Sequence, residues 1–309
     1  MKYFVLALTL LASAVLADEF QNVDIDWSTV KPIAYYPKFW DNKPAHMRPS
    51  PRFFDEYERQ RAKNGGLIVG GRPAQPHQFP YQAAVLMFLP DIGGQALCGG
   101  SLVGTQTILT AAHCVDGATH GTIVLGAHFL TNQAEPNQRR IAVPGSAVVM
   151  HPDWNPLLIR DDVAIVRLGG PAPLIPGAIQ PAILPAMSDV NYDFAGEDGV
   201  VSGWGVTNSA NPVAAEVLHY VYDNILTHAQ CSFSIPVIIQ PTMICMTGSA
   251  NRGACNGDSG GPLTVRRGAN SMQVGIVSFG VAIGGCENIF PSVFGRVTSY
   301  LPWLYANII

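Results

Sequence analysis

Over most of its length the chain alternates short apolar runs with clusters of Gly, Pro, Asn and Ser. Short runs that end in turn-forming residues predict β-strands, and their spacing favours antiparallel barrels or a sandwich. The pattern is not that of long amphipathic helices. The predicted strands lie at 81–89, 101–110, 122–125, 147–150, 163–168, 199–202, 213–222, 262–265, 273–278 and 292–297.

The carboxyl end follows a different pattern. Apolar residues recur there at helical spacing, at Tyr300, Trp303, Leu304 and Ile308. Pro302 suits the first turn of a helix, so we predict a C-terminal helix at about 298–309. A Pro- and Gly-rich run at 169–185 would link two medium-sized domains, although the length also suits a single large one.

The amino end has the pattern of a secretory signal. Lys2 precedes an apolar run at 3–16, and small residues at 15–17 suit a cleavage site, so residues 1–17 are predicted to be a signal peptide. A membrane anchor would need about 20 apolar residues, but Asp18 and Glu19 end the run too soon. No later stretch qualifies, so we expect a secreted, extracellular protein with no membrane partner.

Charge divides the rest of the chain into two parts. Residues 18–67 hold 8 basic and 8 acidic side chains, whereas residues 68–309 hold 9 arginines, no lysine and 14 acidic side chains. The first part is either a mobile tail or a removable pro-segment. A Gly-rich junction at 64–66 stands before the apolar residues 67–69, and this favours a pro-segment at 18–67.

Composition excludes several classes of protein. Charged residues make up 13% and hydrophobic residues 48%, which is not the balance of a disordered chain. A net charge of −4 argues against nucleic acid as a partner. The 31 Gly and 24 Pro argue against a helical bundle. Six Cys in an exported chain favour disulfides over free thiols or zinc.

Three segments carry side chains that suit catalysis. His113 stands beside a Cys in 110–114 (Thr-Ala-Ala-His-Cys), Asp162 precedes an apolar strand, and Ser259 lies in the Gly-rich turn 257–262. Each segment alone is common in proteins without catalytic activity. All three together, in an exported chain with paired Cys, indicate a common site.

On these residues the chain resembles a trypsin/chymotrypsin-type serine protease over about 68–309. The motifs that carry the resemblance are 68–71 (Ile-Val-Gly-Gly), 98–102 (Cys-Gly-Gly-Ser-Leu), the His113 segment, 162–165 (Asp-Val-Ala-Ile), 202–205 (Ser-Gly-Trp-Gly), the Ser259 segment and 278–280 (Ser-Phe-Gly). The resemblance implies an all-β fold of two antiparallel Greek-key β-barrels, at about 68–175 and 185–296, with the active site between them and a C-terminal α-helix.

The resemblance also implies a role for each of the three side chains. A serine hydroxyl is a weak nucleophile and needs a base within hydrogen-bond reach, which an imidazole supplies near neutral pH. Ser259 would be the nucleophile, His113 the general base and then acid, and Asp162 the carboxylate that orients the imidazole. Asp161 is the competing carboxylate, and we expect it to be solvated. The amides of Gly257 and Ser259 would form the oxyanion hole.

Activation would depend on Asp258, because a buried carboxylate needs a partner. The resemblance supplies the α-ammonium of Ile68, released by cleavage between Leu67 and Ile68; the alternative is that Asp258 is a plain turn residue. The family's commonest form has Arg or Lys before the cut. We therefore expect an activating protease that prefers apolar residues, which could be the enzyme itself. Basic sites lie further upstream, at Arg59, Arg61 and Lys63.

Six Cys allow 15 pairings. The resemblance selects one of these connectivities, with the three bonds Cys98–Cys114, Cys231–Cys245 and Cys255–Cys286. It also places the floor of the specificity pocket at Gly253, with Ala254 beside it, and the walls at Ser278, Gly280 and Ser292. An uncharged and open pocket predicts chymotrypsin-like cleavage after Phe, Tyr, Trp, Leu or Met.

Several alternatives concern the pocket and the activity. Glu287 and Asp193 are the nearest other acids, and we expect both on the surface. Elastase-like specificity is a second possibility, but Gly280 does not narrow the pocket. A catalytically inactive homologue that acts as a binding protein is a third, although such homologues typically lose the nucleophile or the base.

Partners and cofactors follow from the same interpretation. We expect protein or peptide substrates, an activating protease and protein protease inhibitors as partners, a monomer, and a digestive role. No cofactor and no metal are expected, since Ala127 stands where many family members carry a calcium ligand and has no oxygen to offer from its side chain.

Overall fold

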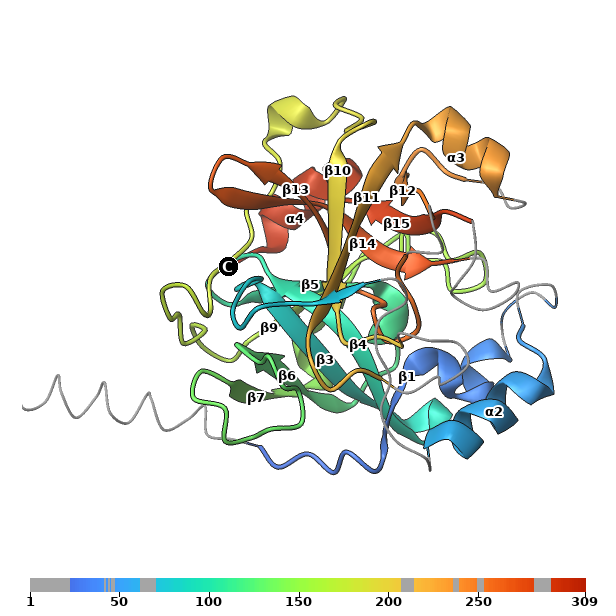
Figure 1. The fold of residues 1–309 in the computed structure, drawn as a ribbon, viewed down its shortest axis with the longest axis vertical. Coiled ribbons are helices and arrows are strands. Elements are labelled where there is room, and N and C mark those ends of the chain that lie inside the picture. The colour runs from blue at the N-terminus through green and yellow to red at the C-terminus, as the bar shows by residue number, and fades with distance from the viewer. Residues whose placement is uncertain are drawn as a thin grey trace, which may run out of the picture.

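The computed structural model describes residues 23–41, 43, 45, 48–61, 71–206, 214–235, 239–248, 253–280 and 290–309. These residues form two β-sheets and a C-terminal helix, and the molecule is mostly β (Figure 1). One sheet closes into a six-stranded barrel and the other curls into a half-barrel, so the predicted fold class is confirmed.

The first sheet is formed by strands β3 to β9, in the order β7-β6-β3-β4-β5-β9-β8. Its neighbouring strands are antiparallel, and the short strand β1, which lies outside this path, pairs with the first half of β4. The strands are β1 (Val30–Pro32), β3 (Gln82–Leu89), β4 (Gly94–Leu102), β5 (Thr107–Thr110), β6 (His120–Leu125), β7 (Arg139–Pro144), β8 (Val148–Met150) and β9 (Ala164–Arg167).

The second sheet closes because its first strand pairs with β11 as well as with β13. The ring runs β10-β13-β14-β15-β12-β11, and β2 pairs with β11 outside it. The strands are β2 (Arg72–Pro73), β10 (Asp198–Gly203), β11 (His219–Leu226), β12 (Met243–Met246), β13 (Pro262–Arg267), β14 (Asn270–Phe279) and β15 (Ser292–Arg296).

Helices are short and lie outside the barrels. The C-terminal helix has a 3-10 turn, η9, before the α-helical part α4, which begins one residue before Pro302. The helices are η1 (Ile33–Tyr35), η2 (Pro37–Trp40), α2 (Pro51–Arg61), η4 (Pro90–Ile92), η5 (Ala112–Cys114), η6 (Gly145–Ala147), η7 (Met187–Asp189), α3 (His228–Ser234), η9 (Val297–Tyr300) and α4 (Leu301–Asn307). Within the described part of the chain, none of these helices has the length and apolar character needed to cross a bilayer.

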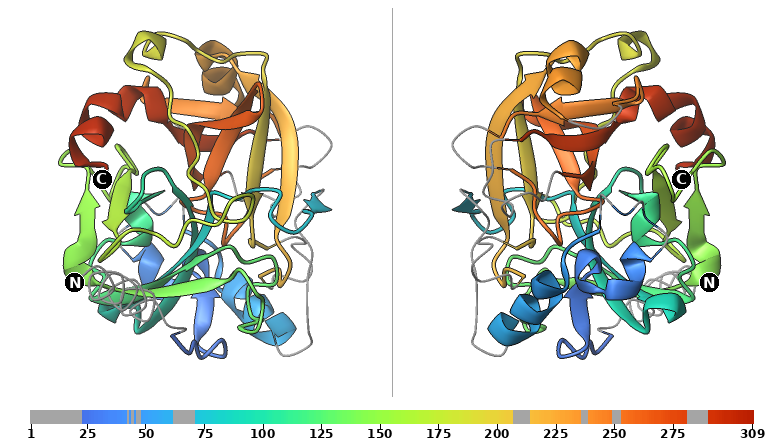
Figure 2. Two further views of the ribbon diagram at one scale, coloured as in Figure 1. Left: turned by 90° about the vertical axis from the view of Figure 1, so that its left-hand side faces the viewer. Right: turned by 90° about the vertical axis from the view of Figure 1, so that its right-hand side faces the viewer.

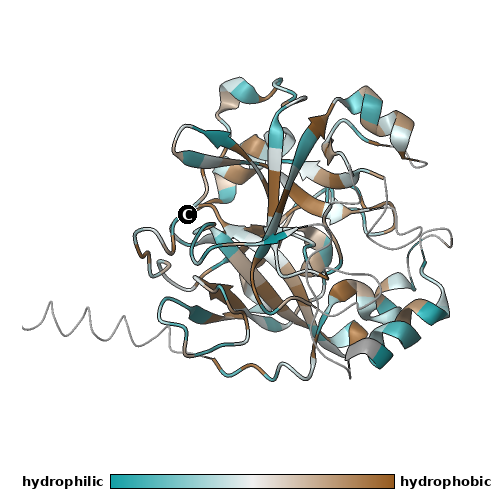
Figure 3. Cartoon of the chain, viewed as in Figure 1, coloured by the Kyte–Doolittle hydropathy of each residue, from teal (hydrophilic) through white to brown (hydrophobic). Residues whose placement is uncertain are grey.

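Apolar side chains form a buried core in each of the two sheets. In Figure 3 many residues of the strands have the brown colour of hydrophobic residues. The half-barrel core extends to α4, whose Leu301 and Leu304 are fully buried in it. In the closed barrel, Leu263 and Phe294 are fully buried at the centre. Helix α4 is therefore held by its apolar face, as the sequence pattern predicted.

Several predicted strands differ from the observed ones. The predicted strand 101–110 is interrupted, because the chain turns between β4 and β5. Strands β7 and β12 were not predicted, and β11 begins later than the predicted 213–222 and runs beyond it. Strand β7 was not predicted because it begins with two arginines, which do not suggest a buried strand. Arg140 is nevertheless buried, and its Nε donates to the Gln138 side chain.

The described residues of 23–61, which precede the half-barrel, form short helices and one strand, and we call them the N-terminal segment. It is drawn in blue in Figure 2, in the lower part of both views, and its strand β1 pairs with β4 of the first sheet. Tyr35 is stacked between Phe53 and Tyr57, with ring centroids 4.7 and 4.0 Å apart, and Lys31 forms an ion pair with Glu58. The described residues of this segment thus pack on one another, and its role as a removable pro-segment stays a prediction.

Candidate active site

His113 and Asp162 are brought together by the pairing of β5 with β9. Each residue lies next to the end of one of these strands, and Thr110 is opposite Ala164 in the register. His113 Nδ1 lies 2.7 Å from one oxygen of Asp162, and the His113 amide donates to the other at 2.9 Å. Both side chains are buried. The carboxylate therefore fixes the orientation of the ring, with Nδ1 toward itself.

A third side chain completes the surroundings of Asp162. Ser278 Oγ, on β14, donates to Asp162 Oδ2 at 2.5 Å. Burial raises the pKa of Asp162, but the charge of His113 and the hydrogen bonds from His113 and Ser278 outweigh it, so that the pKa is below its usual value. Asp162 is thus held as a carboxylate. Ser278 was expected to form a pocket wall, and its hydroxyl serves this carboxylate as well.

Asp161, the competing carboxylate, turns away from His113. Its φ is +52°, a conformation that side chains other than Gly rarely adopt, and its carbonyl accepts from the Val163 amide. The side chain of Asp161 accepts instead from the Tyr300 hydroxyl at 3.3 Å. The unusual turn at Asp161 therefore presents Asp162, and not Asp161, to the imidazole.

The turn with Ser259 docks against the end of β5. The Gly99 amide donates to Ser259 O at 2.7 Å, and the Gly260 amide donates to Val277 O. Gly260 has a φ of +79°, and a Cβ there would lie 2.2 Å from Thr110 Oγ1, three residues before His113. Only glycine permits this approach. The turn is thereby anchored beside the imidazole.

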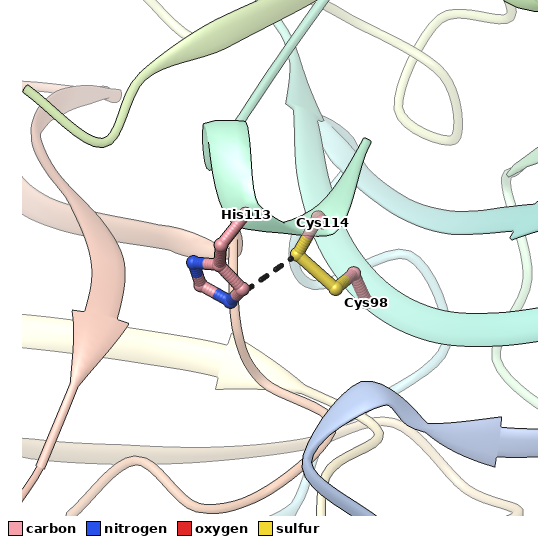
Figure 4. Close-up of side chains that lie close together, drawn as sticks. All are labelled: Cys98, His113 and Cys114. Carbon is pink, nitrogen blue, oxygen red and sulfur yellow. Dashed lines mark hydrogen bonds between the residues drawn. A yellow bond between two sulfur atoms is a disulfide. The ribbon is translucent and has the colours of Figure 1, made fainter. Parts of the chain in front are cut away.

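Figure 4 shows the imidazole of His113 beside the disulfide Cys98–Cys114. Among the described side chains, Nε2 lies 3.6 Å from Cys114 Sγ, and no hydrogen bond joins it to Ser259 Oγ. Cys114 Sγ in turn lies 3.5 Å from Ser259 O. The ligand atoms of Cys98, His113 and Cys114 lie as close together as those of a metal site. The two sulfurs are bonded to each other, however, and neither is the thiolate that binds metals.

Asp258 is buried between two glycines of the 202–205 motif. Its carboxylate accepts from the Gly205 amide at 2.8 Å and from the Cys255 amide at 2.9 Å. A Cβ on Gly203 would lie 2.2 Å from Asp258 Oδ1, so the motif makes room for the carboxylate. Burial raises the pKa of Asp258 to about 6, although the two hydrogen bonds oppose the effect.

No described Lys, Arg or His pairs with the Asp258 carboxylate. The expected partner, Ile68, and the preceding Leu67 lie outside the described residues. Gly257, expected in the oxyanion hole, has a φ of +101°.

Three of the predicted pocket residues are adjacent. The Ala254 amide donates to Ser292 Oγ at 3.2 Å, and a Cβ on Gly253 would lie 2.9 Å from the same oxygen. A Cβ on Gly280 would meet no described atom within 4 Å. Asp193 is exposed and its carboxylate accepts from the Ala195 amide, whereas Glu287 lies outside the described residues.

Two of the three expected disulfides, Cys98–Cys114 and Cys231–Cys245, are present. Cys255 is also disulfide-bonded, and its expected partner, Cys286, lies outside the described residues. The first bond joins β4 to the His113 turn. The second joins α3 to β12.

Sequence reasoning missed the part of the N-terminal segment that contacts the site. The ring of Phe39 lies with its centroid 5.9 Å from that of His113, and Pro32 lies against Gly257. Lys43 is buried near Asp162 and donates to Pro156 O at 2.6 Å. The sequence carries one signal of such contacts, an aromatic cluster at 35–40, which is unusual in a segment otherwise rich in charge.

Comparison with known proteins agrees with this geometry. A family model described as Trypsin matches residues 68–304. A chymotrypsin of Phaedon cochleariae is 38% identical over 78% of this chain and 82% of its own length, and a brachyurin of Leptuca pugilator is 38% identical over 77% and 96%. A chymotrypsin-C of Rattus norvegicus is 36% identical over 78% and 88%. The solved structure of HL collagenase superimposes with a TM-score of 0.68 at 33% identity, covering 78% of this chain and 98% of that one.

Proposed function

This chain belongs to the trypsin family of serine endopeptidases, and on that premise we propose that residues 68–309 cleave proteins after large apolar residues. The observation that carries the proposal is the buried His113–Asp162 pair with the Ser259 turn anchored beside it. The site contains an acid that stays ionised, an oriented imidazole and a serine, which together suit acyl transfer.

In the proposed reaction the hydroxyl of Ser259 attacks the carbonyl carbon of the scissile bond. His113 Nε2 takes the hydroxyl proton and then gives it to the departing amine, which leaves an acyl-enzyme. Water then attacks the acyl carbon and loses a proton to the same nitrogen. The bond from that carbon to Ser259 Oγ breaks, the acid leaves, and the proton passes from His113 to Ser259 Oγ. The amides of Gly257 and Ser259 would stabilise the oxyanion of each tetrahedral intermediate, and Asp162 would stabilise the imidazolium.

Activation is proposed to follow cleavage between Leu67 and Ile68 of a secreted precursor, in which residues 1–17 are the signal and 18–67 the pro-segment. Support comes from the Asp258 carboxylate, which is buried with two amide donors and no described cation. A new α-ammonium at Ile68 would supply the missing charge and hold the Ser259 turn in its active form. A digestive role fits an enzyme without narrow specificity.

Specificity is proposed to be chymotrypsin-like. The contact of Gly253 and Ala254 with Ser292 provides no charged group for an Arg or Lys side chain, and Gly280 adds no side chain that would narrow the entrance. Relatives named chymotrypsin and chymotrypsin-C agree with this choice, whereas elastase-like cleavage would need a bulkier residue at the entrance.

The test uses a full chain in which residues 63–67 are replaced by Asp-Asp-Asp-Asp-Lys, which we call the activatable chain. Enteropeptidase cuts it after the lysine and leaves Ile68 as the new amino terminus. At nanomolar concentration the cut chain should react covalently with a fluorophosphonate and cleave a peptide library after Phe, Tyr, Trp, Leu or Met. Ser259→Ala should abolish both. Labelling without apolar specificity would contradict the specificity alone, and a cut chain that never labels would be an inactive homologue.

A further inference from the structure

The N-terminal segment reaches both sides of the candidate active site. The residues that do so are 30–41 together with Lys43, which we call the cleft segment. Its strand β1 runs parallel to β4, with Val30 opposite Gln95 and Pro32 opposite Leu97. The other pairs among the described strands of the two sheets are antiparallel, so β1–β4 differs from them in being parallel.

On one side the cleft segment lies on the loop that holds the proposed oxyanion donors. A Cβ on Gly257 would lie 3.4 Å from Pro32 Cγ, and Asn256 Nδ2 donates to the Tyr35 hydroxyl at 3.2 Å. Residues 32–36 are all buried. Tyr35 also packs with Val206 and Cys255 in one apolar cluster. This side of the site is therefore covered.

On the other side the cleft segment lies beside the imidazole. Phe39 is 5.9 Å from His113 between ring centroids. Lys43 Nζ lies 5.1 Å from the Phe39 ring centroid and 5.7 Å from that of Trp154, and it donates to Pro156 O. Lys43 is only 5% exposed, and Asp162 and Asp116 are near enough to act on its charge. A lysine so buried is a specific contact of the segment with the site.

The segment occupies the site in a form that is unsuitable for cleavage. Peptides that a binding edge recognises as substrates are extended. Here the chain folds into the 3-10 turns η1 and η2 as soon as β1 ends. The atoms of the segment nearest to a Cβ on Gly257 would be Cγ and Cβ of the Pro32 ring. The segment therefore lies over the Ser259 loop and beside His113 as a folded chain, and not as an extended substrate strand.

We propose that the cleft segment is a built-in inhibitor that stays bound after cleavage between Leu67 and Ile68. The first Cys of the chain is Cys98, so no disulfide can tie the segment to the enzyme, and the hold on it is noncovalent once the chain is cut. Activation then needs two steps, the cut and the loss of the segment by dilution or digestion. This inference rests on the proposed function.

The activatable chain tests the proposal through its concentration dependence. After the cut, hydrolysis of a short peptide is read from the first seconds at micromolar and at nanomolar concentration. Activity per mole should be lower at micromolar concentration by about tenfold or more, because a noncovalent inhibitor dissociates on dilution. In parallel, the cut Ser259→Ala chain, which cannot digest the segment, should retain it during gel filtration at micromolar concentration.

Matched variants identify the contacts responsible. Phe39→Ala should raise activity per mole at micromolar concentration by about tenfold, as expected for a buried aromatic anchor of an interface, and Lys43→Ala should act in the same direction. Phe54→Ala, whose ring contacts Phe53 on α2, and the exposed Lys38→Ala are the controls and should change nothing.

Two results would overturn the proposal. One is an activity per mole that is equal at micromolar and nanomolar concentration from the first reading, whether or not the segment is retained in gel filtration. The other is a Phe39→Ala chain that behaves like Phe54→Ala. Absence of activity and of fluorophosphonate labelling at every concentration would instead contradict the proposed function, and gel filtration of the Ser259→Ala chain would still decide whether the segment binds.

Discussion

Asp258 is the residue whose protonation should change most on activation. Before the cut its carboxylate is buried with two amide donors and no described cation, and burial raises its pKa to about 6 from 3.8. After the cut, the proposed ammonium of Ile68 would favour the charged form and lower the pKa. One side chain would thus oppose the precursor fold at neutral pH and favour the active one.

This difference predicts how the stability of the uncut chain depends on pH. Because the pKa of Asp258 is raised in the folded state, the side chain stabilises the fold most in its protonated form. This contribution to the free energy of unfolding is fully present below about pH 4 and is lost as the pH rises through about 6. A pKa difference of about two units corresponds to a free-energy difference of about 3 kcal/mol. In urea unfolding, the stability of wild type relative to Asp258→Asn should therefore fall by up to that amount between pH 4 and 7. Asp91→Asn, at an exposed position, is the control. A difference that stays constant with pH would contradict the prediction.

At the scale of elements, glycine positions explain why the loops around the site can meet. Gly203 ends β10 where the Asp258 carboxylate lies, and Gly260 lets the Ser259 turn touch the end of β5. The motifs that hold these glycines could be recognised in the sequence. Strands β7 and β12 could not, because one begins with arginines and the other is a short run whose pairing with β15 depends on residues far along the chain.

The glycine at 203 gives a direct test of this packing. A Cβ there would lie 2.2 Å from Asp258 Oδ1, inside any van der Waals distance, so the carboxylate or the strand must move. We expect Gly203→Ala to lower the free energy of unfolding by about 1–3 kcal/mol, the usual cost of overpacking. Gly169→Ala is the control, since a Cβ there meets nothing within 4 Å and φ is not positive. Equal midpoints of thermal unfolding for the two variants would be inconsistent with this packing.

At the scale of the whole molecule, the sequence predicted the two-barrel body and the meeting of His113 with Asp162, because both depend on short motifs beside strands. It did not predict the hydroxyl of Ser278 on Asp162, since that contact needs the register of a strand from the other barrel. Nor did it predict the fold of the N-terminal segment, which depends on the aromatic stack around Tyr35 and on the pairing of β1 with β4. Charge density and Pro content suggested a pro-segment but not its structure.

The aromatic stack also predicts that the molecule opens in two stages. Tyr35 is only 3% exposed and stacks on Phe53 and Tyr57, whereas β1 joins the half-barrel by pairing with a single strand, β4. Tyr35→Ala should therefore lower the local opening free energy of the N-terminal segment by about 3 kcal/mol or more. Hydrogen exchange of the uncut chain should then speed up in residues 30–36 and leave β10 to β15 protected. Phe233→Ala, at a side chain 94% exposed on α3, should alter neither region. Faster exchange throughout the closed barrel would mean that the segment and the barrels unfold as one unit.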